Sequence, residues 1–269
     1  MNASISSGWL DDFVSEHRVT ISAVFPVIGA VLLILSATGS LPDVIAFNPW
    51  LILFGVIVMR LPLIVGLLPV LDHRAVLGLA TLSLYSYIIE VVGVQTGWPY
   101  GWFSYGVSLG PMIAGVPVAL PLLFLPLVLN AYLLVLLVIP SARSTWYTRI
   151  ISVITVVLAI DFVLDPGAVS LGFWSYESSW LHGVPLSNYL GWVLSATVAT
   201  IGFDAALRTN AVVNRLSSTP FMLDDLVSFT LLWGSVNAFY YNISSVLVAL
   251  GFIGLLVHAD RFDLPGITG

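Results

Sequence analysis

The sequence predicts an all-α polytopic membrane protein, a bundle of about seven transmembrane helices with an internal parallel repeat. Hydrophobic residues make up 59% of the 269-residue chain and charged residues only 8%, whereas a soluble chain carries about 25% charged residues. The mean hydropathy is +1.04, and several apolar runs reach about 20 residues, the length that spans a bilayer. This composition excludes a soluble domain.

The apolar segments give the expected spans, and the last segment leaves their number open. The segments are 19–38, 47–71, 75–95, 115–139, 149–165, 185–206 and 226–258. As one helix the last segment would be about 48 Å long, which exceeds a hydrocarbon core of about 30 Å. It is either one long tilted helix or two short spans broken near Asn242 to Ser245. We expect seven spans, with eight as the alternative.

The chain ends lie outside this single transmembrane bundle of residues 19–258. Residues 1–18 are expected to form a cytoplasmic N-terminal segment and residues 259–269 a C-terminal tail. An apolar face in the first segment is typical of a short helix lying in the membrane interface, and a frayed polar tail is the alternative. The residues of this face are Trp9, Leu10, Phe13, Val14 and His17.

Arginine occurs in alternate connections between the spans, which predicts the orientation in the cell membrane. The arginines that precede span one or lie at the connections between later spans are Arg18, Arg74, Arg143, Arg149, Arg208 and Arg215. Arg261, after the last segment, fits eight spans better. The connections 39–46, 96–114 and 166–184 contain none. Because positive residues favour the cytoplasmic side, we expect a cytoplasmic N-terminus and these three loops outside the cell.

Composition also excludes several kinds of chemistry. The chain contains neither cysteine nor lysine, which removes disulfides, thiolate metal sites, Schiff bases and therefore a retinal protein. The net charge of −6 argues against nucleic acid as a partner. Asp161 and Asp165 match an Asp-x-x-x-Asp pattern for magnesium diphosphate, as in prenyltransferases. The pattern occurs once, however, and the loops expected outside offer no cation for a phosphate. No metal or cofactor is predicted.

Two units of the chain repeat each other. Gly101–Tyr105 reads Gly-Trp-Phe-Ser-Tyr, and Gly172–Tyr176 reads Gly-Phe-Trp-Ser-Tyr 71 residues later. The same offset takes Glu90 to Asp161, so these two acids are expected at matching depth near the outer end of their helices. Both units enter the membrane from one side and predict a parallel repeat about an axis along the membrane normal. The Gly-Val-Pro tripeptides are residues 115–117 and 183–185. The two repeat units are residues 75–139 and 149–206.

Ionisable residues inside spans are costly and mark functional sites. The spans contain Arg60, Glu90, Asp161 and Asp165, and the two aspartates lie about 40° apart on one helix face. The structural alternative is an ion-paired network in which Arg60 balances one acid. Three acids against one base leave an excess of carboxyl groups, some of which should be protonated. A buried carboxylic acid that keeps its proton is a proton donor, which favours a functional site.

Aromatic residues crowd the two arginine-free loops beside these acids. An interfacial aromatic belt explains any one of them, but it does not explain the repeat. His182 precedes the second Gly-Val-Pro, and Asn188 lies one turn into the following helix, where an interhelical hydrogen bond is the alternative to holding a water. The candidate substrate-binding residues are Trp98, Trp102, Tyr105, Trp174, Tyr176, His182, Asn188 and Trp192.

Residues 75–206 resemble the CruF-type carotenoid hydratases. The stretches that carry the resemblance are Glu90–Tyr105, Leu109–Pro111, Gly115–Pro117, Asp161–Pro166, Gly172–Tyr176, Gly183–Pro185 and Asn188–Trp192. The resemblance implies addition of water to the terminal isoprenoid double bonds of a long acyclic fifty-carbon carotenoid. The expected partners are that carotenoid, water and the lipid bilayer, with no cofactor.

Such a hydration needs a desolvated acid, aromatic faces for a carbocation and one positioned water. We therefore expect Asp161 to donate the proton, with Glu90 favouring its protonated form and Asp165 positioning the water. The roles of Glu90 and Asp161 are exchangeable at this stage. Arg60 is expected to set the charge balance. The residues expected to line the cation pocket are Trp102, Tyr105, Trp174 and Tyr176. A carotenoid cyclase, a prenyltransferase-type enzyme and a non-enzymatic carotenoid-binding or transport protein are the alternatives.

Overall fold

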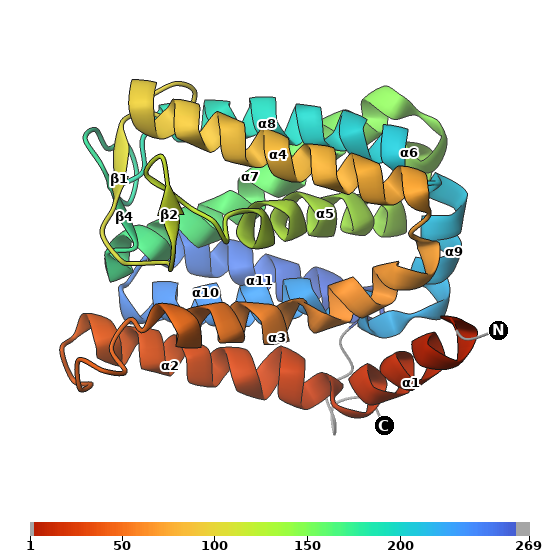
Figure 1. The fold of residues 1–269 in the computed structure, drawn as a ribbon, viewed down its shortest axis with the longest axis horizontal. Coiled ribbons are helices and arrows are strands. Elements are labelled where there is room, and N and C mark those ends of the chain that lie inside the picture. The colour runs from red at the N-terminus through yellow and green to blue at the C-terminus, as the bar shows by residue number, and fades with distance from the viewer. Residues whose placement is uncertain (1–2, 262–269) are drawn as a thin grey trace.

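Within residues 3–261, which the computed structural model describes, eight long helices run side by side along one axis (Figure 1). They are α2 (Phe25–Ala37), α3 (Pro49–Leu67), α4 (His73–Thr96), α5 (Pro121–Val138), α7 (Trp146–Leu171), α8 (Leu186–Ala206), α10 (Asp224–Phe239) and α11 (Ile243–His258). Six spans are long and apolar enough to cross a membrane, and α11 is a shorter apolar helix. The expected all-α polytopic membrane bundle is confirmed.

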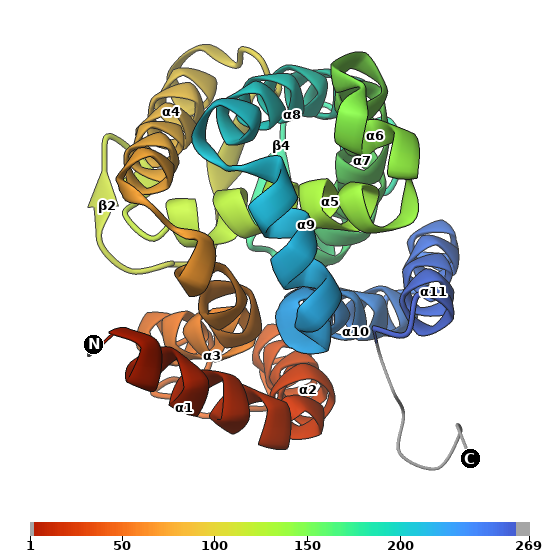
Figure 2. The same cartoon turned by 90° about the vertical axis from the view of Figure 1, so that its right-hand side faces the viewer.

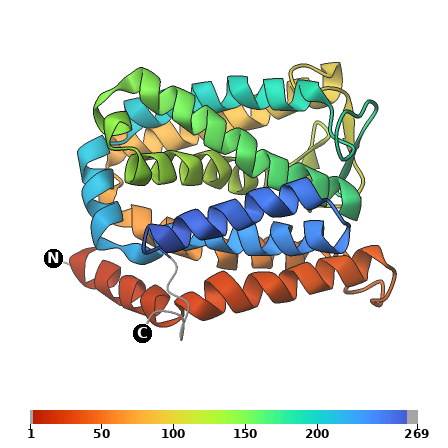
Figure 3. The same cartoon turned by 180° about the vertical axis from the view of Figure 1, so that it is seen from behind.

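The last apolar segment is two helices and not one. Helices α10 and α11 run antiparallel, with α11 on the outside of the bundle (Figure 3) and α10 packed between α11, α7 and α2. Tyr240–Asn242 separates them, with φ of Tyr241 at +60°, close to the break expected in the eight-span alternative. Two amides hold this turn, because Asn242 donates to Asn237 Oδ1 at 2.9 Å and Asn237 donates to the Val163 carbonyl at 2.7 Å.

Short elements connect the long helices at both ends of the bundle. The short helices are α1 (Ala3–Glu16), α6 (Pro140–Ser144) and α9 (Thr209–Ser218), and the strands are β1 (Phe103–Tyr105), β2 (Met112–Ile113), β3 (Val116–Pro117) and β4 (Trp174–Tyr176). A π-helical turn, Thr20–Val24, joins α1 to α2, and single 3₁₀ turns precede α4 and α10. All four strands lie at one end, opposite α9 (Figure 1).

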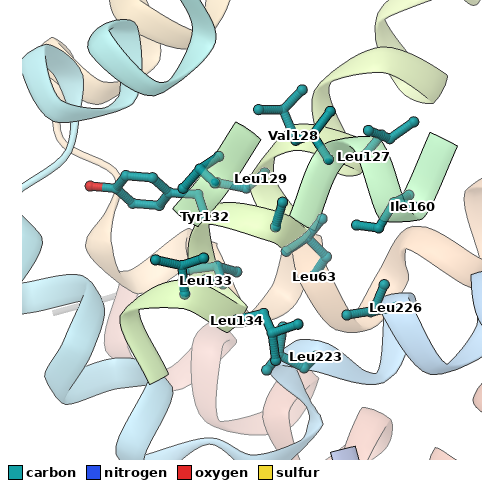
Figure 4. Packing of buried hydrophobic residues seen from close by; sticks show 14 of the residues in the cluster. Leu63, Leu127, Val128, Leu129, Tyr132, Leu133, Leu134, Ile160, Leu223 and Leu226 are labelled. Atoms are coloured by element: carbon teal, nitrogen blue, oxygen red, sulfur yellow. The ribbon is translucent and has the colours of Figure 1, made fainter. Parts of the chain in front are cut away.

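Helix α5 forms the centre of the bundle (Figure 2). It contacts α3, α4, α7, α8 and α10, and 67% of its span is buried inside the molecule, the largest share of any span. Its apolar residues therefore contact protein on every side, unlike those of a span that faces lipid. Figure 4 shows this packing, in which Leu127–Leu134 of α5 meets Leu63, Ile160, Leu223 and Leu226.

Helix α7 continues beyond the predicted end at residue 165. Pro166 has no N–H for the Phe162 carbonyl, but the Ser245 hydroxyl of α11 donates to that carbonyl at 2.7 Å. A neighbouring helix thus replaces the lost backbone hydrogen bond, as transmembrane proteins commonly allow. The helix then runs six further residues to Leu171, which places Asp165 well inside it.

The N-terminal segment is helical, and its apolar face divides into two parts. Leu10 and Val14 pack with Val65 and Phe221, whereas Trp9 is 66% exposed. Met1 and Asn2, and residues 262–269 of the expected C-terminal tail, lie outside the described residues. The assignment of the N-terminal segment to the cytoplasm stays a prediction.

Candidate functional site

Strands β1 and β4 bring the two repeat units together. They pair antiparallel, with Ser104 opposite Ser175 and Tyr105 opposite Trp174. Ser104 and Ser175 are equivalent positions of the repeat, 71 residues apart, and the repeat therefore corresponds to a local two-fold arrangement. The strand pair lies over the ends of α4 and α7 (Figure 1).

The Gly-Val-Pro tripeptides of the two units also adopt matching conformations. Ala114 and Gly115 have φ of +52° and +83°, and His182 and Gly183 have +51° and +82°. Positive φ at both central residues is typical of a two-residue hairpin turn. Ile113 pairs with Val116 and Leu181 with Val184 around these turns. The internal repeat is thus visible in the backbone as well as in the sequence.

Each unit holds one carboxyl group against its own tyrosine. Tyr105 donates its hydroxyl to Glu90 Oε1, and Tyr176 donates to Asp165 Oδ2 at 2.8 Å. Both carboxyl groups lie on a helix that ends in a glycine of positive φ, and in each case seven residues before that glycine, Gly97 or Gly172.

The structural counterpart of Glu90 is therefore Asp165. The 71-residue offset of the sequence repeat indicates Asp161 instead. Counted from the helix ends, Gly97 and Gly172, the offset is 75 residues. Between helix end and strand, the first loop has four more residues than the second. Asp161 lies one turn deeper in α7, away from the matching depth that we expected.

An asparagine joins the two aspartates of α7. Asn188 of α8 donates its amide nitrogen to Asp161 Oδ2 at 2.9 Å and to Asp165 Oδ2 at 2.6 Å. Asp161 Oδ1 is buried beside the Trp192 indole and has no hydrogen bond of ordinary geometry among the described residues. The sequence prediction that Asp161 and Asp165 share a helix face is confirmed, and Asn188 is part of the site.

The ion pairs formed by the described arginines all involve other acids. Arg60 lies 2.5 Å from Asp225, a buried carboxylate on α10 to which Asn130 also donates. The expectation that Arg60 balances a site acid is therefore wrong, because Asp225 neutralises it inside the bundle. The remaining pairs are Arg18–Asp224, Arg149–Asp204, Arg208–Asp72 and Arg215–Asp11. Among the described residues, no cation pairs with Glu90, Asp161 or Asp165.

A cavity of about 90 Å³ adjoins these groups. Of the predicted site residues, those that line it are Glu90, Tyr105, Asp165, Trp174, Tyr176, Asn188 and Trp192. Asp161 is not among the lining residues, so Asn188 connects it to the cavity only indirectly. Half of the lining residues are aromatic, and the Phe124 and Trp192 rings stack at 5.2 Å between centroids.

Three predicted binding residues lie elsewhere. Trp98 and Trp102 are about half exposed, and Trp102 covers the backbone of Gly97. His182 contacts α11, where its Nε2 lies 2.7 Å from the Ser244 hydroxyl. None of the three lines the cavity, and their role in binding stays a prediction.

Sequence reasoning missed Tyr100, which the longer first loop inserts into the site. Its hydroxyl lies 2.6 Å from the Ser195 hydroxyl, and its ring packs on Gly191, where a Cβ would come within 2.4 Å of it. Burial raises the pKa of Tyr100, Tyr105 and Tyr176 well above the ordinary value of a tyrosine, and nearby carboxyl groups add to the effect. These phenols therefore remain hydrogen-bond donors. The signal was the extra Trp-Pro-Tyr sequence in the first loop.

A second, larger cavity of about 200 Å³ adjoins the first. The two share Leu123, Leu127, Leu164 and Trp174 in their walls. The larger cavity extends between α2, α3, α5, α7 and α10, and its lining is almost entirely apolar. The site is thus a small acidic cavity beside a larger apolar cavity.

Comparisons with known proteins identify the family of the chain. The chain is 55% identical over 255 residues to the bisanhydrobacterioruberin hydratase of Haloarcula japonica, covering 94% of this chain and 87% of the relative. No solved structure matches the chain. Residues 47–256 match the family model described as carotenoid biosynthesis protein, and this span includes both repeat units and the carboxyl groups of Glu90, Asp161 and Asp165. The chain therefore belongs to the carotenoid biosynthesis protein family.

Proposed function

We propose that this chain is a hydratase that adds water to the terminal isoprenoid double bonds of bisanhydrobacterioruberin, an acyclic fifty-carbon carotenoid. The proposed substrate is the one in the name of the relative from Haloarcula japonica. The observation that carries the chemistry is the pair Glu90 and Asp165, a half-buried and a buried carboxyl group that line one cavity without a cationic partner among the described residues.

The proton donor is the pair of aspartates on α7. Two carboxyl groups held by one amide cannot both be ionised at low cost, because like charges at this distance repel each other. They therefore share a proton between them. Asp165 lines the cavity and delivers that proton, while Asp161 is a positioning residue that acts through Asn188.

The first step makes a carbocation. The π electrons of the alkene form a C–H bond at the less substituted carbon, and the O–H bond of the Asp165 carboxylic acid breaks. The positive charge remains on the tertiary carbon. Trp192, Phe124 and Trp174 present ring faces and edges to this cavity, and aromatic faces attract a cation most strongly where water is excluded. The carboxylate of Glu90 adds electrostatic stabilisation.

The second step adds water. A lone pair of a water molecule forms the C–O bond to the tertiary carbon, and Glu90 accepts the proton that the water loses. Transfer of a proton from Glu90 back to the aspartate pair restores the starting state. The net reaction is one alkene plus one water, and it balances without a metal, nucleotide or redox cofactor.

The proposal is tested by incubating the chain in lipid vesicles with bisanhydrobacterioruberin and measuring pigment masses, in which each hydrated bond adds one water. We expect Glu90→Gln and Asp165→Asn to lower the rate by about 10²-fold or more, the usual contribution of general acid–base catalysis. Asp161→Asn should lower it less and should shift the pH profile of the rate.

Asp43→Asn is the matched control, because Asp43 is an exposed carboxylate in the loop 39–46 and should leave the rate unchanged. Full activity of both Glu90→Gln and Asp165→Asn would exclude the mechanism. A polyene that leaves the wild-type protein with its mass unchanged would instead support a carotenoid-binding or transport protein.

A further inference from the structure

We infer that the carotenoid reaches the acidic cavity sideways from the bilayer, through the larger apolar cavity between α2 and α3. This inference rests on the proposed function, since it names the route of that substrate. It is carried by the residues that the walls of the two cavities share, by the chemistry of the larger cavity and by the position of its mouth.

The shared wall makes the larger cavity the approach to the acids. Leu164 precedes Asp165 on α7, and Trp174 pairs with Tyr105 on the neighbouring strand. An isoprenoid end that enters past Leu164 and Trp174 therefore arrives directly at Asp165.

The hydroxyl, amide and guanidinium side chains of the larger cavity are already engaged, whereas the buried Trp174 Nε1 has no acceptor among the described residues. Ser36 donates to the Leu32 carbonyl, Asn48 caps the start of α3 by accepting from Trp50 and Leu51, and Arg60 is paired with Asp225. An occupant thus gains little from hydrogen bonds to this wall, and an apolar chain is the occupant that fits.

The mouth of the cavity opens on the side of the spans. Leu32 of α2 and Leu51 of α3 line the cavity and are 43% and 53% exposed. Both helices lie at the edge of the bundle (Figure 2), where their exposed side chains meet lipid. Along α3 the lining extends from Asn48 to Arg60, which is about 18 Å at 1.5 Å per residue.

The length of the cavity indicates that only one end of the substrate is enclosed. The lining of about 18 Å along α3 is much shorter than an extended fifty-carbon chain. The rest of the polyene must extend through the gap between α2 and α3 into the bilayer, where it was dissolved before binding.

Two glycines keep this passage wide. Gly29 and Gly55 line the cavity from α2 and α3, and a Cβ at Gly55 would have its nearest contact at 3.8 Å, on the Phe25 ring. Position 55 therefore accepts a side chain without a clash, and a large side chain there would fill the passage.

The first experiment places phenylalanine at this position and measures polyene bound per protein, by absorbance after purification, together with hydration. We expect Gly55→Phe to lower both by about tenfold or more and Gly55→Ala to lower them less. Gly251→Phe is the matched control, because Gly251 lies on α11 with open space around its Cβ position, and both readouts should stay within about twofold of the wild type.

A second experiment avoids any effect on folding. The chain contains no cysteine, so a thiol introduced by Leu51→Cys can be alkylated after the protein has folded. Alkylation should lower hydration, and bound carotenoid should slow the alkylation. Leu247→Cys on α11 is the control, because Leu247 is 63% exposed and lines neither cavity, and its alkylation should have no effect.

The outcomes separate this inference from the proposed function. Glu90→Gln should retain bound polyene while losing hydration, whereas Gly55→Phe should lose both. If Gly55→Phe and the alkylated Leu51→Cys variant both bind and hydrate as well as their controls, the lateral route is overturned while the hydratase stands. A wild-type protein that binds the polyene and leaves it unhydrated overturns the proposed function but supports the route.

Discussion

Asp165 and Glu90 are equivalent only when they are counted from the ends of their helices. Each lies seven residues before a glycine cap, and each accepts a hydrogen bond from the tyrosine that ends its own strand. The sequence repeat instead aligns the two strands, and in that alignment Asp161 corresponds to Glu90. The residue that lines the cavity is thus identified by backbone geometry and not by the repeat alone.

Removing the Tyr176 hydroxyl, which donates a hydrogen bond to the proposed proton donor Asp165, should slow hydration. Tyr176→Phe deletes the hydrogen bond of 2.8 Å to Asp165. A hydrogen bond to a charged group contributes about 1.5–3 kcal/mol, and about 1.4 kcal/mol corresponds to tenfold in rate. We expect a loss of roughly tenfold to a hundredfold in the initial rate, measured by pigment mass.

Tyr147→Phe serves as the comparison, since Tyr147 lies near the other end of α7 and is 57% exposed. Equal rates for the two variants would show that the Tyr176 hydroxyl does not assist the reaction.

The sequence was sufficient to name half of the residues that line the acidic cavity but not their partners. Glu90 and Asp165 were predicted because ionisable residues inside spans are rare, and Tyr105 and Tyr176 because they recur in the repeat. Side-chain directions were beyond reach. Arg60 pairs with an acid 165 residues away in the chain, and no local pattern connects them.

At the scale of elements, α7 shows why a predicted end was wrong. A proline predicts the end of a helix, yet the Ser245 hydroxyl accommodates Pro166. Likewise, the length of segment 226–258 and the polar Asn242 indicate that a break is possible. Whether the segment forms one helix or two depends on tertiary contacts with α7.

The ion pair between α3 and α10 should behave as a structural unit. Arg60→Met leaves Asp225 buried and unpaired with an arginine, and breaking a buried pair in this way costs about 3–5 kcal/mol. The double variant Arg60→Met, Asp225→Leu should recover most of the lost stability, measured by thermal unfolding in detergent.

The same two measurements decide between the roles of Arg60. If the double variant is no more stable than Arg60→Met alone, then the Asp225 contact does not account for the buried arginine.

At the scale of the molecule, the arginine distribution predicts an orientation that the cysteine-free chain allows us to test. Single thiols from Ser40→Cys and Ser144→Cys lie in exposed positions at opposite ends of the bundle. A membrane-impermeant maleimide should label the first in intact cells and the second only after permeabilisation, because positive loops stay in the cytoplasm. The reverse pattern would invert the proposed topology.

The buried phenols predict how the stability of the molecule depends on pH. Burial raises the pKa of Tyr100 in the folded state, whereas the unfolded chain releases this proton near pH 10. Above that pH the unfolded state binds fewer protons than the folded state, so the free energy of unfolding falls as the pH rises. One such group contributes up to about 1.4 kcal/mol per pH unit.

Melting temperatures between pH 8 and 11 measure this effect. Tyr100→Phe should reduce the fall above pH 10, and Tyr241→Phe, at an 82% exposed position, should not. An unchanged slope for Tyr100→Phe would show that this phenol ionises as readily in the folded protein as in the unfolded one.

The strand pair at Ser104 and Ser175 joins two units that each bring their own acid and their own phenol. Because the pairing is locally two-fold, each half would need only an identical copy of itself to enclose a chamber with the same acid and the same phenol on both walls. Two differences make the walls unequal. The first half has four more residues before its strand, and the second has another aspartate, Asp161, one turn behind Asp165.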